Sequence, residues 1–228
     1  MHGPSQQREE TRSPLTRERV IAAALSIADR KGVTAVTMRQ VAKILRVEAM
    51  SLYHHVSSKD AILDGMVDRV FGEIGLPPPT EDWKQALHTC YVSAREALAR
   101  HPWAVGLMDS RRNPGSATLR HHDAVIGCLR LAGFSIPMAG HGIAVLDSYL
   151  YGFAVQEQAL PFNTPKELED VAESIFSIEV VGQYPHLAEL ASKHVLRPGY
   201  AFGDEFQIGL DLILEGLERL LFQAEVGT

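Results

Sequence analysis

The chain is poor in the residues that indicate export or a membrane. It has only two cysteines among 228 residues, Cys90 and Cys128, and they lie in separate segments. Such usage is typical of a reducing compartment, and neither cysteine has the neighbours of a metal site. No apolar run approaches the ~20 residues that span a bilayer, and no charged-then-apolar signal opens the chain. We therefore expect a cytoplasmic protein with no membrane contact.

The composition is that of a globular protein, with 46% hydrophobic and 22% charged residues. The length allows one or two domains with a substantial core. The net charge of −6 is unevenly divided. Between Arg12 and Lys59, nine Lys and Arg face four acidic residues counted up to Asp60, about +5, which leaves about −11 elsewhere. This asymmetry favours a DNA-facing end and an acidic body.

Residues 37–59 have the outline of a helix-turn-helix. The first helix, capped by Thr37, repeats apolar residues up to Leu45 at helical spacing. A short turn then leads to a second helix over 49–55, whose short or flat donors suit phosphates and base edges. A plain helical hairpin with solvated polar residues is the competing interpretation. The candidate DNA contacts are Thr37, Arg39, Arg46, Ala49, Met50, Ser51, Tyr53, His54, His55 and Lys59.

Five elements occur in order along this region: residues 20–25, Gly32, residues 36–42, Leu52-Tyr53-His54-His55-Val56 and Lys59-Asp60-Ala61-Ile62-Leu63. Together they resemble the DNA-binding domain of the TetR (tetracycline repressor-like) family. Arg46 departs from the pattern, because the family usually has a turn glycine there. The backbone at Arg46 is therefore either strained or part of another type of turn.

Helical periodicity continues through the rest of the chain, and no segment reads as a strand, so we predict an all-α fold. The polar residues 1–14 are expected to form a disordered tail, or an arm whose Arg8 and Arg12 reach a minor groove. Three prolines after Leu76 end the DNA-binding domain, 15–75, and a larger ligand-binding and dimerisation domain follows over 80–228. The predicted helices cover residues 15–31, 37–45, 49–55, 58–74, 82–99, 104–108, 116–132, 137–160, 166–181, 185–196 and 204–224.

Two late segments, 143–155 and 208–221, are apolar around most of the helix circumference. Each needs a second layer, which is either another helix of the chain or a partner subunit. Gly209 and Gly216 would permit close helix approach. A dimer also places two recognition helices about one duplex turn (~34 Å) apart. We therefore predict a homodimer that binds a palindromic operator; a large intrachain core is the alternative.

The C-terminal half also resembles the tetracycline-repressor-like ligand domain, in residues 133–136, 151–153 and 206–218. The resemblance implies a pocket in each subunit between the long helices, although core packing explains most of its candidate residues equally well. Family members that bind tetracycline with magnesium use a histidine and an acid where this chain has Met108 and Gln156. A thioether is a poor ligand for magnesium, so another hydrophobic inducer is expected. The candidate pocket residues are Val70, Phe71, Ile74, Cys90, Met108, His122, Val125, Ile143, Asp147, Tyr151 and Gln156.

The resemblance implies a transcriptional repressor released by a small-molecule inducer, for example an antibiotic or an exported metabolite. An activator or a ligand-only variant of the same fold is the alternative. Enzyme chemistry has little support in the sequence, because His121 and His122 point about 100° apart on a helix. No glycine-rich phosphate loop or nucleophile elbow is present either. We expect no catalytic site, no cofactor and no bound metal.

Overall fold

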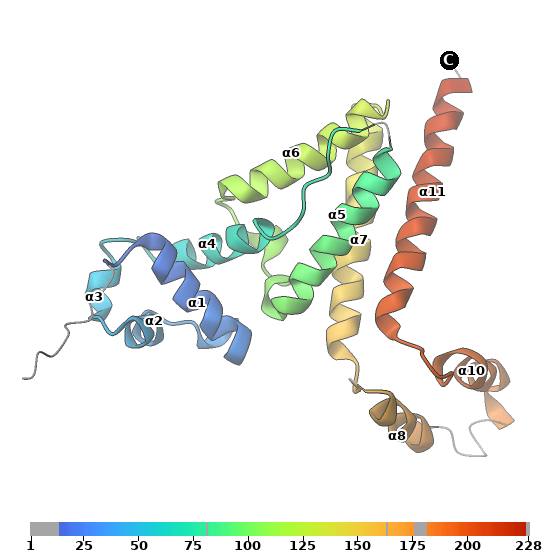
Figure 1. Ribbon diagram of the computed structural model, residues 1–228, viewed down its shortest axis with the longest axis horizontal. Coiled ribbons are helices and arrows are strands. Elements are labelled where there is room, and N and C mark those ends of the chain that lie inside the picture. Colours follow the sequence, from blue (N-terminus) through green and yellow to red (C-terminus); the bar gives the residue numbers. More distant parts are fainter. Residues whose placement is uncertain (1–13, 81, 163, 176–181, 227–228) are drawn as a thin grey trace, which may run out of the picture. The chain divides into compact units, whose positions relative to one another are not determined.

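The protein is described by a computed structural model over residues 14–80, 82–162, 164–175 and 182–226. Within these ranges the secondary structure is helical and contains no strand, which confirms the predicted all-α fold (Figure 1). The chain divides into two compact units, one ending at Val67 and the other beginning at Asp68. The boundary falls inside one helix, α4, which spans Lys59–Phe71. The predicted tail lies outside the described residues except for Pro14.

The first unit contains α1 (Arg17–Lys31), α2 (Met38–Leu45), α3 (Ala49–Leu52) and the first turns of α4. Its core is formed by apolar side chains that are completely enclosed. At one point α4 approaches α1 so closely that a Cβ added to Gly65 would collide with Ile21. The enclosed side chains include Val20, Ala24, Val41, Leu52 and Ile62.

Local capping explains where these helices begin. The Thr16 hydroxyl accepts the Arg19 N–H at 3.3 Å at the start of α1. The Thr37 hydroxyl accepts the Gln40 N–H at 3.2 Å at the start of α2. Ser58 caps α4 in the same way, with its hydroxyl 3.1 Å from the backbone nitrogen of Ala61. The Thr37 cap was predicted from the sequence, and in each of the three caps a side-chain oxygen satisfies an otherwise unpaired N–H.

The recognition helix α3 is shorter than predicted, ending at Leu52 instead of His55. The next three residues form a tighter turn, in which the N–H of His55 bonds to the carbonyl of Leu52 at 2.9 Å. The side chain of the following Val56 is buried, and this holds the turn against the core. Similarly, α4 ends at Phe71 instead of 74, and i→i+3 turns close it.

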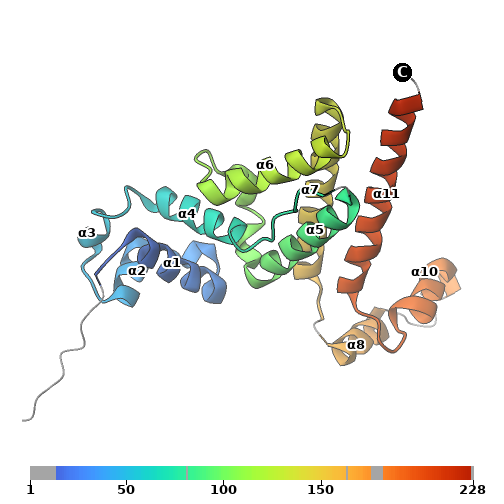
Figure 2. The ribbon, with the colours of Figure 1, turned by 45° about the horizontal axis from the view of Figure 1, so that its top comes forward.

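The second unit is built on α5, α7 and α11, which lie side by side in both views (Figures 1 and 2). The predicted segment 104–108 is replaced by two 3₁₀ turns, Pro102–Ala104 and Met108–Ser110. Residues 176–181 of the predicted helix 166–181 lie outside the described part. The α-helices of this unit after α4 are α5 (Trp83–Arg100), α6 (Ser116–Leu131), α7 (Ile136–Ala159), α8 (Pro165–Ile175), α10 (Pro185–Leu190) and α11 (Glu205–Val226), and a π turn, Ala191–Val195, follows α10.

One polar and aromatic cluster joins the three long helices. Arg95 of α5 pairs with Glu157 of α7. Its guanidinium also lies 5.6 Å from the ring centroid of Phe206 on α11. The Tyr149 hydroxyl donates to the carbonyl of Phe206 at 3.1 Å, so α7 and α11 are joined directly. A Cβ added to Gly209 would collide with this hydroxyl.

Large apolar side chains on α7 and α11 remain uncovered in the single chain. Val145 and Val155 on α7 are about half exposed. The exposed residues of α11 alternate with the buried Leu210, Leu214 and Leu217, so one face of the helix is inside and another is open. The intrachain core therefore does not cover the apolar circumference noted in the sequence. The exposed apolar residues of α11 are Ile208, Leu212, Leu220 and Phe222.

Candidate DNA-binding surface and ligand site

The turn of the helix-turn-helix has an unusual backbone at Arg46. Its φ of 56° and ψ of 45° place it in the left-handed region. Among the described residues it is the one non-glycine with positive φ. The N–H of Val47 bonds to the carbonyl of Ala42 at 3.1 Å, which is the helix-ending arrangement that normally has glycine at this place. Of the two alternatives for Arg46, the structure therefore has the strained one, at a cost of about 1 kcal/mol.

The candidate DNA contacts all lie on accessible parts of the first unit. Met50 and Tyr53 are 73% and 48% exposed, although both are large. Leu52 between them is completely buried and fixes α3 to the core. Lys59 is exposed at the first residue of α4, where its charge and the helix N-terminus can both face a phosphate. Arg39, Arg46 and His54 are exposed, Thr37 is exposed while serving as the α2 cap, and Ala49, Ser51 and His55 are partly exposed.

The candidate pocket residues divide into a buried and an accessible group. Phe71, at the end of α4, lies with its ring centroid 5.4 Å from that of His122 on α6. Asp147 on α7 accepts a hydrogen bond from the Tyr91 hydroxyl at 2.8 Å, so its carboxylate already has a protein partner. Val70, Phe71, Ile74, Cys90, Met108 and Val125 are buried, His122, Ile143, Asp147 and Tyr151 are partly exposed, and Gln156 is exposed.

Burial shifts the titration of the groups around Asp147. Burial raises the pKa of the Cys90 thiol to about 12, with smaller contributions from Cys128 and Asp147. Burial and then the Asp147 charge raise the pKa of Tyr91 well above its usual value. Thiol and phenol are therefore both neutral at pH 7, and this part of the site offers neutral polar groups beside one carboxylate.

His122 was the predicted pocket residue, but His121 is the more deeply buried of the two histidines. His121 is 6% exposed, and its Nδ1 has no hydrogen-bond partner among the described residues. Burial, followed by the neighbouring His122, lowers the pKa of His121 to about 4. Its ring centroid lies 5.2 Å from that of Phe71. The two adjacent histidines are visible in the sequence, but which of them is buried depends on how α6 is rotated about its axis.

The C-terminal half of α4 is bound to α6. The Asp68 carboxylate accepts the backbone N–H of Thr118 at 2.8 Å and the Thr118 hydroxyl at 3.0 Å. Thr118 lies in the first turn of α6, whose preceding residue, Gly115, supplies no side-chain cap. Asp68 therefore caps α6 from a different helix.

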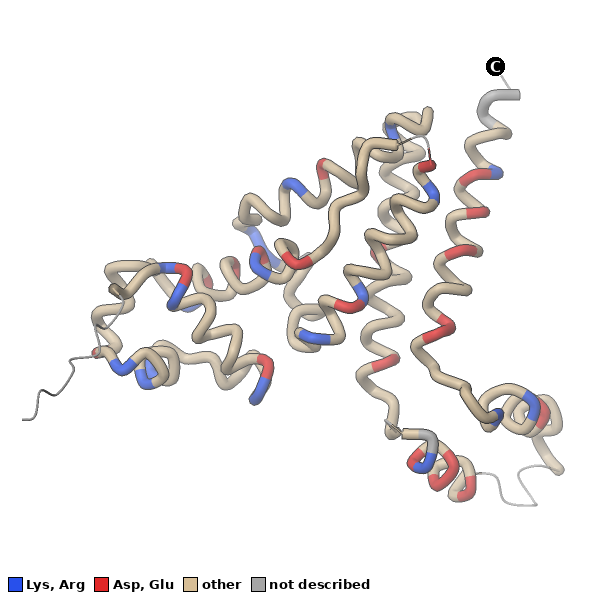
Figure 3. Tube along the Cα trace, viewed as in Figure 1, with Lys and Arg blue, Asp and Glu red and all other residues tan. Residues whose placement is uncertain are grey.

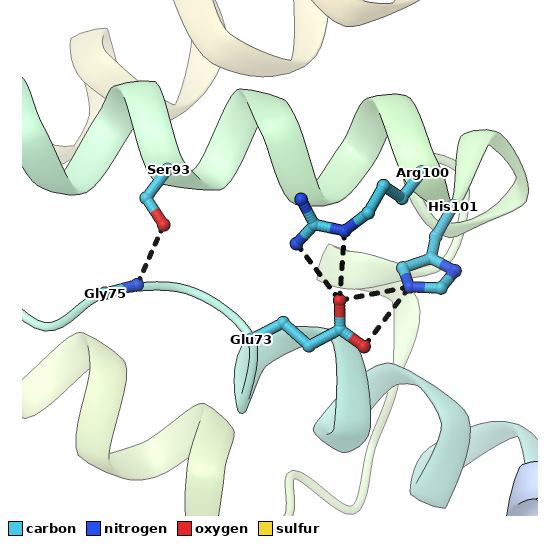
Figure 4. Close-up of polar contacts among 5 residues, drawn as sticks. All are labelled: Glu73, Gly75, Ser93, Arg100 and His101. Atoms are coloured by element: carbon cyan, nitrogen blue, oxygen red, sulfur yellow. Dashed lines mark hydrogen bonds and ion pairs between the residues drawn. The ribbon is translucent and has the colours of Figure 1, made fainter.

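Just beyond α4 the chain is also bound to α5 (Figure 4). One oxygen of the Glu73 carboxylate lies 3.1 Å from the Arg100 guanidinium. The same carboxylate lies 3.3 Å from Nε2 of His101, a buried side chain. Two residues further on, the Gly75 N–H donates to the Ser93 hydroxyl at 3.0 Å. The end of α4 is therefore connected to both helices that carry the candidate pocket residues Cys90, His122 and Val125.

A hollow also lies near the C-terminal helices, away from the candidate pocket residues. It has a volume of about 690 Å³ and lies between α8 and the α10 segment. Its walls include Ala172, Ala188 and Leu196, together with the acidic Glu169 and Glu173. None of the candidate pocket residues lines it.

Comparison with known proteins identifies the family. Residues 20–66 match the family described as "Bacterial regulatory proteins, tetR family". Residues 76–221 match the "Tetracyclin repressor-like, C-terminal domain". The chain belongs to the TetR family. It is a DNA-binding transcriptional regulator of that family and not an enzyme, as the sequence predicted.

Individual members of the TetR family are similar to this protein along most of its chain. The HTH-type transcriptional repressor DrrR1 of Streptomyces coeruleorubidus is 34% identical over 221 residues, covering 92% of this chain and 79% of the relative. The class C tetracycline repressor of Escherichia coli is 27% identical over 209 residues, covering 90% and 92%. The crystal structure of the Streptomyces coelicolor TetR family protein ActR in complex with actinorhodin has a TM-score of 0.73 at 25% identity, covering 92% and 99%.

In the described part of this TetR protein, no helix is long and apolar enough to cross a membrane. No group of three or more His, Cys, Asp and Glu in the same ranges could hold a metal ion.

Proposed function

We propose that this TetR protein represses transcription as a homodimer bound to a palindromic operator, and that a hydrophobic small molecule releases it. The observation that carries the proposal is the combination of an exposed helix-turn-helix surface with uncovered apolar faces on α7 and α11. The helix-turn-helix surface would contact one half-site of the operator. The apolar faces of α7 and α11 would join two copies of the chain, so that the dimer contacts both half-sites.

The dimer is supported by the apolar residues that the single chain leaves open. Val155 on α7 and Leu212 on α11 are 54% and 66% exposed. Several large apolar side chains exposed along one helix, as on α11, are typical of an interface. A twofold axis would bring the same two helices of each copy together in a four-helix arrangement.

The inducer is supported by the mostly apolar character of the candidate pocket residues and by a relative. ActR has been crystallised with actinorhodin and with (S)-DNPA. In this chain Met108 is buried where the resemblance to magnesium-dependent tetracycline binders would require a histidine. A neutral, oxygen-bearing aromatic compound suits the buried thiol, phenol and imidazole better than a metal complex does.

Release of DNA would proceed through α4. This helix is continuous across the boundary between the two units, and its end is bound to α6 by Asp68 and to α5 by Glu73. A ligand that favours a different placement of α5 and α6 would also favour a different placement of α4. A ligand shifts the equilibrium only by its difference in affinity for the two placements.

The test is a fluorescence-anisotropy titration of the protein with DNA flanking its own gene, repeated with actinorhodin and a panel of hydrophobic drugs. We expect salt-sensitive binding that at least one compound reverses, and a dimer mass by light scattering. Tyr53→Ala serves as the control that should weaken DNA binding without changing the mass. Specific binding that no compound reverses would contradict the inducer, and a monomeric mass would contradict the dimer.

A further inference from the structure

A cleft of about 770 Å³ lies between α1 and α2 in the first unit. Four of its lining side chains are cationic: Arg30 and Lys31 in the last turn of α1, Lys43 in the last turn of α2, and Arg46 in the turn after it. No Asp or Glu lines the cleft. The four side chains are exposed and form no ion pair with another described residue.

The ends of the two helices explain part of this arrangement. A cation in the last turn of a helix offsets the helix dipole, typically by 0.3–1 kcal/mol. That effect accounts for one cation at each helix end, but Arg46 lies beyond α2, and α1 ends with two cations. Four like charges around one cleft repel each other, and a bound anion removes this repulsion. Figure 3 shows the Lys and Arg positions along α2.

We propose that this cleft holds the DNA backbone next to the half-site that α3 reads, and so extends the phosphate contacts beyond the helix-turn-helix. The cleft is continuous with the expected DNA surface, because Thr37 and Arg46 belong to both. The other side of the cleft is lined by Arg30 and Lys31 at the C-terminal end of α1. Duplex DNA carries a negative charge about every 1.7 Å along its axis, so it can meet several of these cations at once. The inference rests on the proposed operator binding.

The experiment compares two duplexes. The operator is selected in vitro from random duplexes, and its core is the run of base pairs whose sequence the selection fixes. One probe holds the core alone, and the other extends it by about one helical turn at each end. Anisotropy titrations over a series of salt concentrations then give the affinity and the salt slope of the wild type on both probes. We expect the wild type to bind the extended probe more tightly.

Arg30→Gln/Lys31→Gln is the decisive variant, because these two lining cations lie on α1, outside residues 37–59 of the helix-turn-helix. We expect it to lose roughly fivefold in affinity on the extended probe, with a salt slope lower by about two units per protomer. Its affinity for the core probe should not change. Arg112→Gln/Arg120→Gln, which removes two charges from the second unit, should match the wild type on both probes.

Other outcomes contradict the proposal. If Arg30→Gln/Lys31→Gln lost the same affinity for both probes, or lost affinity for neither, the cleft would not hold flanking DNA. Lys43→Gln provides a second check, because it removes a cation from the α2 side of the same cleft. It should lower the affinity for the extended probe more than the affinity for the core probe. Thermal unfolding of each variant separates a folding defect from a lost contact. If the wild type bound no duplex at all, the proposed operator function itself would fail.

Discussion

Asp68 caps a helix to which it does not belong. Its carboxylate accepts the backbone N–H of Thr118 at 2.8 Å, joining α4 to the first turn of α6. The residue at the cap position of α6, Gly115, has no side chain to do this, and a Cβ there would collide with the carboxylate. A glycine at the α6 cap and an acid on α4 therefore act as one unit, and the negative charge also faces the positive end of the helix dipole.

Asp68→Ala should lower the free energy of unfolding by about 1–2 kcal/mol, the usual effect of removing a helix cap. Urea unfolding measures this loss. Hydrogen exchange should show faster exchange of the Thr118 amide. Asp68→Asn keeps an acceptor oxygen but not the charge, so its loss should be smaller; an equal loss in both variants would mean that the charge alone matters.

Tyr53→Ala and Lys59→Ala should each weaken operator binding and leave the dimer mass unchanged. Lys59→Ala should also flatten the salt dependence by about one unit of slope, as expected for one phosphate contact. Anisotropy at several salt concentrations measures both effects. Unchanged affinity in both variants would contradict the assignment of the DNA-binding surface.

Arg46→Gly should relieve the left-handed backbone and raise the free energy of unfolding by about 0.5–1 kcal/mol. Arg46→Ala removes the same charge but keeps a side chain in the left-handed conformation, so it should be less stable than Arg46→Gly. The difference between the two variants in urea unfolding isolates the backbone effect. Equal stabilities would show that the turn holds no strain.

His121 should make stability depend on pH. Its pKa is about 4 in the folded protein, against 6.5 as the ordinary value. The unfolded chain therefore takes up a proton first as the pH falls, and up to about 3 kcal/mol of stability is lost between about pH 6.5 and 4. His121→Phe should reduce this slope in urea unfolding at several pH values, whereas His141→Phe, at an exposed position, should not. A wild-type slope in His121→Phe would contradict the assignment.

Gly209→Leu and Gly216→Leu should fail in different ways. A side chain at Gly209 would collide with Tyr149 inside the same chain, so this variant should lose thermal stability. A Cβ at Gly216 meets no described atom within 4 Å, so Gly216→Leu should keep its fold and disturb the dimer. Light scattering and thermal unfolding separate the two effects. A normal dimer with Gly216→Leu would place the interface elsewhere.

Much of the fold could be predicted from the sequence because its signals are local. Thr16, Thr37 and Ser58 each cap a helix through a hydrogen bond that spans three residues, and the apolar period of each helix is visible within a few turns. The lengths of α3 and α4 were overestimated, because the tight turns after Leu52 and Phe71 depend on how the following chain is anchored.

The sequence by itself determined the all-α class, the helix-turn-helix and the family. The tertiary structure decided which of two adjacent histidines is buried and which of two glycines meets a neighbouring helix. It also decided that Asp68 and Thr118, fifty residues apart, form a cap. The physical reason is range: helix periodicity and capping act over three or four residues, whereas burial and pairing between helices depend on their rotation and approach, which the whole core sets together.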